Sequence, residues 1–167
     1  PAALRGFVCA ADAHTEWTSY ASTPRSTKDT AADGSEHTNV HLLEVAWRWR
    51  SIDYAAAEKH EGLRVRGGFS STPLMRSGRL LLATGLGVAA AADPATGEVL
   101  WLYDPYSEGM DFRVGRTRGA VTWSDGTEER LIFLSNGDLV SLDTATGKPD
   151  PAFGRDGRVD PRDLGEH

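Results

Sequence analysis

The side chains best spaced for metal chemistry are two histidines, His37 and His41, which lie four residues apart and would share one face of a helix. Glu36 and Glu44 flank them, so the group could offer nitrogen and oxygen ligands to a zinc-type ion. The segment is short, runs into a pattern typical of a strand, and brings no further ligand pair. We therefore favour a polar surface turn, with metal binding as the lesser alternative.

Two other patterns suggest chemistry and have simpler interpretations. Residues 85–90 have the G-x-G-x-x-A form of a dinucleotide-binding loop. Pro94 would cut short the helix that such a loop needs, so a glycine hairpin is favoured. The adjacent carboxylates of Glu128 and Glu129 could serve acid–base catalysis. They follow a predicted turn and are expected to be solvated.

Composition narrows the class of protein. The 167 residues are 40% hydrophobic and 25% charged, as in a globular protein. The net charge of −6 disfavours nucleic acid and anionic membranes as partners, because both require a basic face. The single cysteine, Cys9, allows no intrachain disulfide. Residues 1–13 include an A-x-A pattern at 11–13, so we expect either the remnant of an export signal or a disordered arm.

The first third of the chain is irregular. Residues 14–38 lack periodicity and are predicted to be loop. In the second half of residues 38–49, bulky side chains such as Trp47 alternate with small or charged ones, which predicts a strand. Residues 51–68 are polar and are predicted to be a surface excursion with one helical turn at 54–60.

From Phe69 onward the sequence shows short strands separated by short turns. The first group is predicted at residues 72–75, 79–84, 88–93 and 98–103, and the second at 118–123, 130–135 and 139–143. The short turns make each group an antiparallel meander. Asn136-Gly137 is the strongest hairpin signal among them.

The two groups are copies of one unit. The sequence Asp-x-Ala-Thr-Gly occurs at residues 93–97 and again, 50 positions later, at 143–147. A period of about 50 with four strands per unit is typical of a propeller blade. The sequence therefore predicts an all-β fold, a partial β-propeller of about two four-stranded blades.

The residues of the repeated motif suit a tight turn. The aspartate can accept hydrogen bonds from backbone N–H groups two or three positions on, and the glycine supplies the left-handed residue. Trp101 follows four residues after Gly97. A ring there can lie over the next blade and seal the joint between the two units.

Two blades cannot close a ring, because propellers need about four to eight. No strand that would close the ring is evident before His167. We therefore expect a piece of a longer protein, with residues 14–167 as N-terminal blades. An isolated copy is expected to expose sheet edges and to associate.

Five motifs occur in a fixed order. They are Val45-Ala46-Trp47-Arg48-Trp49, Ser71-Thr72-Pro73-Leu74-Met75, Ala92-Asp93-Pro94-Ala95-Thr96-Gly97-Glu98, Arg118-Gly119-Ala120-Val121 and Phe153-Gly154-x-x-Gly157-Arg158-Val159-Asp160. The series resembles the N-terminal blades of quinoprotein dehydrogenases that use pyrroloquinoline quinone, and most closely the glucose/quinate/shikimate type. The resemblance implies an eight-bladed propeller closed by tryptophan-docking motifs. It also implies a quinone on the axis beside a calcium-type ion, whose ligands are expected outside this chain.

The resemblance implies three cofactor-binding residues. Arg118 matches the family's Arg-Gly arginine, which contacts the quinone's carboxylates or carbonyl, and a guanidinium can pair with a carboxylate through two parallel hydrogen bonds. Thr117 stands where many relatives have His or Asn, and Ser70 where many have Glu. Gly115 and Arg116 stand where the alcohol branch carries adjacent cysteines, which disfavours that branch. The catalytic aspartate of the family is expected beyond this chain, which alone would be inactive.

Two functions of different class follow. The first, implied by the resemblance, is a periplasmic dehydrogenase, free or membrane-associated, that oxidises a sugar, polyol or other alcohol and passes electrons to a quinone or cytochrome. The second is a non-catalytic propeller that acts as a binding or scaffold module, favoured by the loss of Glu at Ser70. The expected partners are the substrate, the electron acceptor and the remaining blades, with no nucleic acid.

Overall fold

The strands predicted from residue 72 onward pair into two four-stranded antiparallel sheets in this computed structural model, which describes residues 16–22, 25–26, 28, 38–65, 71–111, 113, 117 and 119–165. Blade A contains β1 (Leu74–Arg76), β2 (Arg79–Ala83), β3 (Ala89–Ala92) and β4 (Val99–Tyr103). Blade B contains β5 (Ala120–Ser124), β6 (Glu129–Ser135), β7 (Asp138–Asp143) and β8 (Arg158–Val159). Strand order equals sequence order in both, which confirms the predicted partial propeller.

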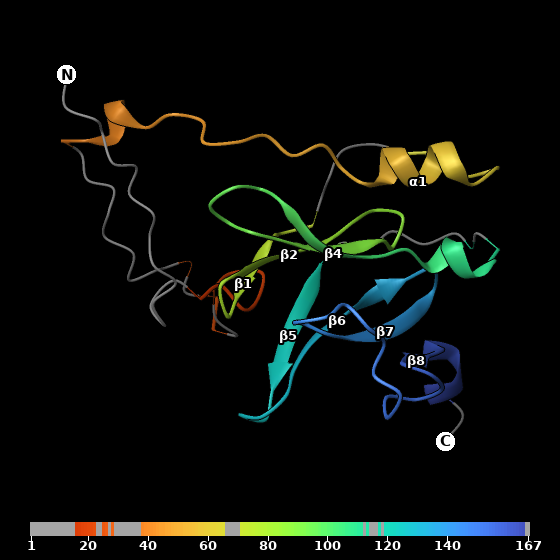
Figure 1. Ribbon diagram of the computed structural model, residues 1–167. Coiled ribbons are helices and arrows are strands. Elements are labelled where there is room, and N and C mark those ends of the chain that lie inside the picture. Colours follow the sequence, from red (N-terminus) through yellow and green to blue (C-terminus); the bar gives the residue numbers. More distant parts are fainter. Residues whose placement is uncertain are drawn as a thin grey trace.

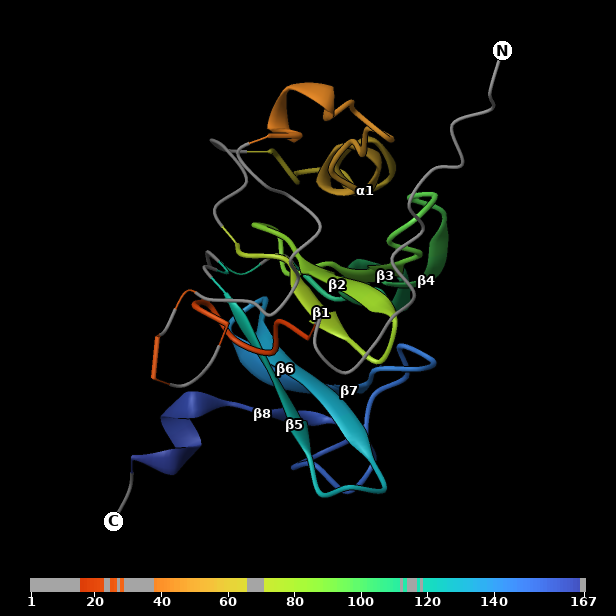
Figure 2. The same ribbon diagram turned by 90° about the vertical axis from the view of Figure 1, so that its left-hand side faces the viewer.

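The helical elements are short. The α-helix α1 spans Asp53–Lys59, and the 3-10 helices are η2 (Val40–Leu42), η3 (Pro105–Glu108) and η4 (Pro161–Leu164). Figures 1 and 2 show the two blades as neighbouring layers, with α1 on the side of blade A that faces away from blade B. None of the helices in the described ranges has the length and apolar character needed to cross a bilayer.

The core lies between the two blades. Alternate residues of each strand point into it, and the largest are Trp101, Tyr103, Leu131 and Phe133. Strand β3 is a run of four alanines without exposed surface, which lets the layers on either side approach closely. Tyr103 and Phe133 meet edge to face across the joint, with ring centroids 6.0 Å apart. Burial of each large side chain contributes about 1.5–3 kcal/mol.

The repeated turns have the conformation that their residues predict. The Oδ1 atom of Asp93 accepts hydrogen bonds from the N–H groups of Ala95 and Thr96, at 2.7 and 2.9 Å. In the second copy Asp143 accepts from the N–H of Thr146 at 2.8 Å. The glycines that end the turns have φ of 75° and 70°. Both copies therefore have the aspartate hydrogen bonds and the left-handed glycine that the motif predicts.

A tryptophan docks on each of these turns. The indole N–H of Trp101, on β4, donates to the carbonyl of Thr144 at 2.9 Å. A Cβ atom on Gly147 would lie 2.5 Å from the Trp101 ring, so only glycine fits beneath it. This confirms the expectation that Trp101 seals the joint with the next blade.

The first turn has the same arrangement. The indole N–H of Trp47 donates to the carbonyl of Pro94, also at 2.9 Å, and a Cβ on Gly97 would lie 2.7 Å from its ring. Pro94 and Thr144 hold the same position of the motif. The chain therefore uses one docking geometry twice, and the second tryptophan comes from the segment before blade A.

The prediction of a strand within residues 38–49 is wrong. Residues 40–42 form η2, and residues 43–50 join no ladder, although Trp47 keeps its contact with blade A. A strand requires a hydrogen-bonding neighbour, and no described residue offers one beside this segment. Val45 is correspondingly 66% exposed.

The sequence predicted three strands for the second group and missed the fourth, β8, which pairs with β7. The outer strand is split into two parts. Next to the turn, the N–H of Asp150 donates to Ser141 at 2.9 Å, and after an excursion of residues 151–157 the pairing resumes at Arg158. Strand β8 has only two residues, which is too short for a periodic pattern that would predict it from the sequence.

The predicted surface excursion at 51–68 is partly buried instead. Helix α1 is longer than the single turn expected, and Asp53, Ala56 and Leu63 are buried against Tyr106 and the turn between β2 and β3. That turn contains residues 85–87 and joins two antiparallel strands, so the dinucleotide-loop alternative is wrong.

Gly147→Ala should destabilise the protein through the docked ring. We expect an Ala at φ of 70° to cost about 1–2 kcal/mol in backbone strain and overpacking against Trp101 to add about 1–3 kcal/mol. Gly126→Ala is the matched control, because Gly126 has φ of 95° and open space around it. Equal losses of unfolding free energy in urea for the two variants would show that the Trp101 contact contributes nothing.

A second joint between the blades depends on Glu129. Its carboxylate accepts hydrogen bonds from Arg76 at 2.8 Å and from the Ser77 hydroxyl at 2.9 Å. Burial opposes the charge, but these hydrogen bonds outweigh it and lower the pKa of Glu129 below its ordinary value of 4.5. The carboxylate therefore stabilises the fold above pH 4.5, and this contribution is lost as the pH falls through the lowered pKa.

Glu129→Gln should accordingly lower the unfolding free energy at pH 7 by about 1–2 kcal/mol, and the difference from wild type should shrink below about pH 4. Urea unfolding at both values of pH measures it. Glu128→Gln is the control, because the Glu128 side chain is 58% exposed and its loss should change stability by less than about 0.5 kcal/mol. A pH-independent loss for Glu129→Gln would contradict the assignment.

Candidate functional site

The innermost strands of the two blades, β1 and β5, lie side by side, and the residues that precede them meet. The hydroxyl of Ser71 donates to the backbone carbonyl of Thr117 at 3.4 Å. Both residues are buried. We call Ser71, Thr117 and Gly119 the inner junction, because they mark the entry of the chain into both inner strands.

Two of the three predicted cofactor-binding residues, Arg118 and Ser70, lie outside the described residues. Their neighbours in sequence are the members of the inner junction. The structure therefore brings together the residue that precedes Arg118 and the residue that follows Ser70.

Thr117, the third predicted residue, is 3% exposed, and its hydroxyl donates to the backbone carbonyl of Leu134 at the end of β6. This bond ties the start of β5 to its neighbour. Gly119 differs, because a Cβ built on it would meet no atom within 4 Å. Arg118 thus stands between a fixed threonine and a glycine with open space beside it.

Asn136 holds the connection between the blades from the other side. Its amide nitrogen donates to the carbonyl of Asp111 at 2.8 Å, and its Oδ1 accepts the backbone N–H of Arg113 at 2.5 Å. The sequence marked Asn136 as a hairpin residue, and it has the left-handed φ of 52° that this implies. Its second role was missed, since nothing local shows which distant backbone an amide will bind.

The neighbouring Ser135 adds a direct bond between the blades. Its hydroxyl donates to the carbonyl of Gly87 at 2.6 Å, in the turn between β2 and β3 of blade A. A Cβ on Gly87 would lie 2.8 Å from the Ser135 backbone. The glycine is therefore required for the two turns to approach, and the approach fixes the inner junction.

The segment 16–22 lies along the inner edges of both blades. Trp17 and Met75 exchange two backbone hydrogen bonds of 2.9 Å, and the carbonyl of Thr18 accepts the N–H of Thr122 at 3.2 Å. The loop predicted at 14–38 thus pairs with β1 at one point and reaches β5 at the next. It links the inner strands without a periodic sequence signal.

Buried polar groups gather where α1 meets blade A. Burial raises the pKa of Asp53, against hydrogen bonds from Thr84 and the backbone of Leu86 and Gly85. The hydroxyl of Tyr106 donates to the carbonyl of Leu86 at 2.6 Å, and burial with the nearby carboxylates raises its pKa to about 12.

Within the described part of the chain, no three histidine, cysteine or carboxylate side chains are grouped to hold a metal ion. His41 is exposed at the end of η2, and His37 lies outside the described residues. The alternative of a metal site on these two histidines gains no support. Glu128 is largely exposed, as expected for a turn residue, whereas Glu129 is bound into the blade joint.

The two four-stranded blades and their docked tryptophans define a β-propeller. A family model described as glucose/ethanol/alcohol dehydrogenase, beta-propeller domain, of the PQQ type, matches residues 17–166. The chain therefore belongs to the PQQ family of glucose/ethanol/alcohol dehydrogenase β-propellers.

Curated relatives agree with this assignment. The chain is 30% identical over 138 residues to the dehydrogenase subunit of a quinone alcohol dehydrogenase from Gluconobacter oxydans, covering 80% of this chain and 16% of the relative. It is 28% identical over 166 residues to a quinoprotein glucose dehydrogenase of the same organism, covering 88% of this chain and 20% of the relative. The chain thus spans about a fifth or less of these proteins.

A solved structure shares the fold. The quinohemoprotein alcohol dehydrogenase from Comamonas testosteroni superposes with a TM-score of 0.58 at 23% identity, over 80% of this chain and 18% of that chain.

The described residues of the inner junction leave room for a polycarboxylate cofactor of the kind the family name implies. The space beside Gly119 is open, and the adjacent residue is an arginine, the side chain best suited to pair with carboxylates. The bond of Thr117 to Leu134 keeps the strand start in place. The donor chemistry and the free space agree with such a ligand.

Thr117→Val should lower the unfolding free energy by about 0.5–1.5 kcal/mol, because it removes the hydroxyl that donates to the Leu134 carbonyl. Chemical unfolding measures the change. Thr127→Val, in an exposed turn, is the control and should change stability by less than about 0.5 kcal/mol. A Thr117→Val variant as stable as the control would mean that the hydroxyl does not hold β5.

Proposed function

We propose that this chain supplies part of the cofactor pocket of a PQQ-dependent dehydrogenase. The observation that supports it most is the inner junction of a propeller from this family, where Arg118 lies between the fixed Thr117 and the open Gly119. The activity belongs to the longer protein of which such blades form a part.

Each residue has a separate role in this proposal. Arg118 pairs with a carboxylate of the quinone through parallel hydrogen bonds, and Ser70 donates a hydrogen bond to it. Thr117 acts as a positioning residue, because its hydroxyl proton is committed to Leu134. The bound quinone supplies the two-electron oxidation of a substrate hydroxyl. Calcium-type ion ligands and the catalytic base belong to blades outside this chain.

The proposed substrate is a sugar, polyol or other alcohol, and the proposed acceptor is a quinone or cytochrome. Relatives named for both glucose and alcohol oxidation match the chain. Gly115 and Arg116 favour the glucose/quinate/shikimate type, because they replace the adjacent cysteines of the alcohol branch. The proposed compartment is the periplasm, in free or membrane-associated form.

A non-catalytic binding or scaffold module is the second candidate. It is favoured by the serine at position 70, where many relatives carry a carboxylate, and by the engagement of the Thr117 hydroxyl within the protein. Both features reduce the number of groups available to a quinone. This candidate requires the same fold and no cofactor.

The deciding experiment uses the full-length protein that contains this chain. Quinone binding is titrated by fluorescence quenching in the presence of calcium, and dye reduction is then followed with glucose and with a simple alcohol. We expect Arg118→Ala to weaken quinone binding by about tenfold or more, and Arg118→Lys to recover part of the loss as a single point charge.

Arg64→Ala, an exposed arginine beyond α1, is the control and should bind the quinone as wild type does. Wild-type protein that binds no quinone would support the scaffold module instead. Quinone binding with Arg118→Ala equal to wild type would retain the cofactor and remove Arg118 from its site.

A further inference from the structure

The excursion that splits the outer strand of blade B is a built element. Residues 155 and 158 exchange two backbone hydrogen bonds, of 2.8 and 3.1 Å, across a two-residue turn. The central residues Asp156 and Gly157 both have positive φ, 53° and 84°, which is the signature of a type I′ hairpin. The hairpin is therefore rigid, and its register is fixed.

Two glycines lock this hairpin against the blade. A Cβ on Gly154 would lie 2.1 Å from the carbonyl oxygen of Arg158, and a Cβ on Gly157 would lie 2.6 Å from Pro149. The Phe-Gly-x-x-Gly-Arg motif noted in the sequence thus has a packing reason at both glycines. The packing of the two glycines does not explain why Arg155 and Arg158, the paired residues on either side of the turn, are both arginines.

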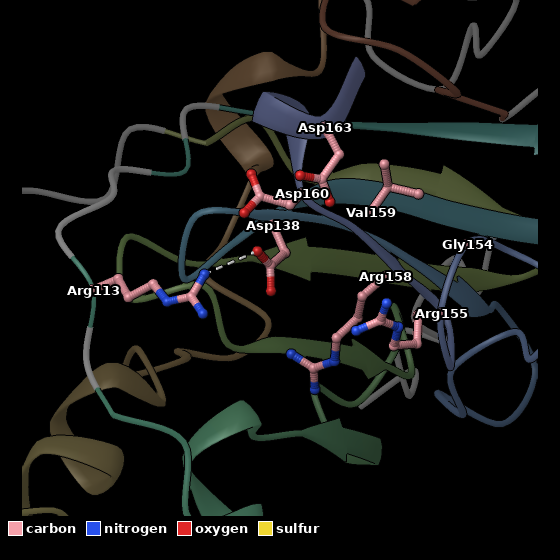
Figure 3. Close-up of a pocket in the computed structure, with 8 residues that line it drawn as sticks. All are labelled: Arg113, Asp138, Gly154, Arg155, Arg158, Val159, Asp160 and Asp163. Carbon is pink, nitrogen blue, oxygen red and sulfur yellow. Dashed lines mark hydrogen bonds and ion pairs between the residues drawn. The ribbon is translucent and has the colours of Figure 1, made fainter. Parts of the chain in front are cut away.

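Arg155 and Arg158 must point to the same face. Directly opposed residues of a hydrogen-bonded antiparallel pair have Cα atoms about 5.5 Å apart and side chains on one side. Figure 3 shows the two side chains next to each other. Like charges in this position are destabilising, so the pair is costly to the fold by itself.

The two arginines differ in their surroundings. The guanidinium of Arg158 lies 5.6 Å from the centroid of the Tyr103 ring, and its Nη1 is 3.2 Å from the sulfur of Met110. Arg155 is exposed, and no carboxylate among the described residues forms an ion pair with it. Arg158 is held in place by these contacts, whereas the positive charge of Arg155 is available to a ligand.

These arginines form one wall of a cleft of about 560 Å³. This volume is in the range of small-molecule sites, about 300–1,000 Å³. The opposite wall in Figure 3 is acidic and consists of Asp138, Asp160 and Asp163. Arg113, also at that wall, is paired with Asp138 at 3.2 Å.

Asp160, at the acidic wall, stays charged at neutral pH. Hydrogen bonds from Arg162 lower the pKa of Asp160 to about 2. Asp138 and Asp160 are each paired with an arginine, so a second negative charge on a ligand would meet repulsion chiefly from Asp163, while a hydroxyl group could donate a hydrogen bond to any of the three carboxylates. The arginine wall of the cleft can bind a carboxylate, and the aspartate wall can accept hydrogen bonds from neutral donors.

We propose that this cleft binds a small monocarboxylate that also carries hydroxyl groups. Its carboxylate lies against Arg155 and Arg158, and its hydroxyls donate to the aspartates of the opposite wall. The cleft is at the outer edge of blade B, three strand spacings or about 14 Å from β5. The proposal does not require a bound quinone and goes beyond the function proposed above.

The test uses calorimetric titration of the full-length, quinone-free protein at pH 7 with three six-carbon probes. D-gluconate has one carboxylate and several hydroxyls, D-glucose lacks the carboxylate, and D-glucarate has a second one. We expect gluconate to bind at least about tenfold more tightly than either of the others, as expected for loss of a charge-assisted pair or gain of a repulsion.

Arg155→Gln should weaken gluconate binding by about tenfold or more, because the exposed Arg155 supplies the charge. Lys148→Gln is the matched control: it removes one exposed positive charge from the same edge of blade B, outside the cleft, and should change the affinity by less than about twofold. A far-ultraviolet circular dichroism spectrum equal to wild type shows that the Arg155→Gln variant is folded.

Three results would overturn the proposal. Gluconate and glucose could bind with equal affinity, which would show that the arginines do not recognise a carboxylate. Inorganic phosphate could match gluconate, which would reduce the cleft to a general anion site. Lys148→Gln could weaken gluconate binding as much as Arg155→Gln, which would reduce the effect to net charge. None of these outcomes bears on quinone binding at the inner junction, so the two proposals fail separately.

Discussion

The contact of a tryptophan ring with a glycine is the constraint on which the rest of the structure depends. Trp47 and Trp101 each lie over the last residue of an Asp-x-Ala-Thr-Gly turn and donate to the same carbonyl of the motif. The glycine meets two requirements at once, a positive φ and the absence of a side chain under the ring. Because the ring comes from the preceding unit, the contact sets the position of one blade on the next, and the polar bonds at Glu129 and Ser135 complete the joint.

The sequence was sufficient for those parts of the fold that repeat. Seven strands, the antiparallel order and the docking of Trp101 follow from period, turn chemistry and alternation. The failures occur where pairing is not local. Residues 43–50 have a strand-like pattern but join no ladder in the described part of the chain, and β8 is two residues long and separated from its turn by an excursion. Hydrophobic periodicity does not show whether a segment has a strand to pair with, or whether its ladder of hydrogen bonds is interrupted.

The candidate site was located from family resemblance and not from pattern. Arg118 and Ser70 have ordinary neighbours in sequence, and only the fold shows that Ser71 and Thr117 meet. The side chains that hold this junction could not be predicted from the sequence. Asn136 clamps a backbone 25 residues away, and the hydroxyl of Ser135 reaches Gly87 in the other blade. Side-chain bonds to remote carbonyls depend on the packing of both blades, so they become apparent only after the joint is known.

The docking arrangement also has a consequence for synthesis on the ribosome. Each tryptophan precedes its glycine along the chain, Trp47 by 50 residues and Trp101 by 46. At about 5–20 residues per second, each indole emerges roughly 2–10 s before the turn that covers it. During that interval a large apolar ring is without its contact and open to wrong partners. The order of translation therefore imposes a waiting time on every blade, and a chaperone that shields aromatic side chains would act at this stage.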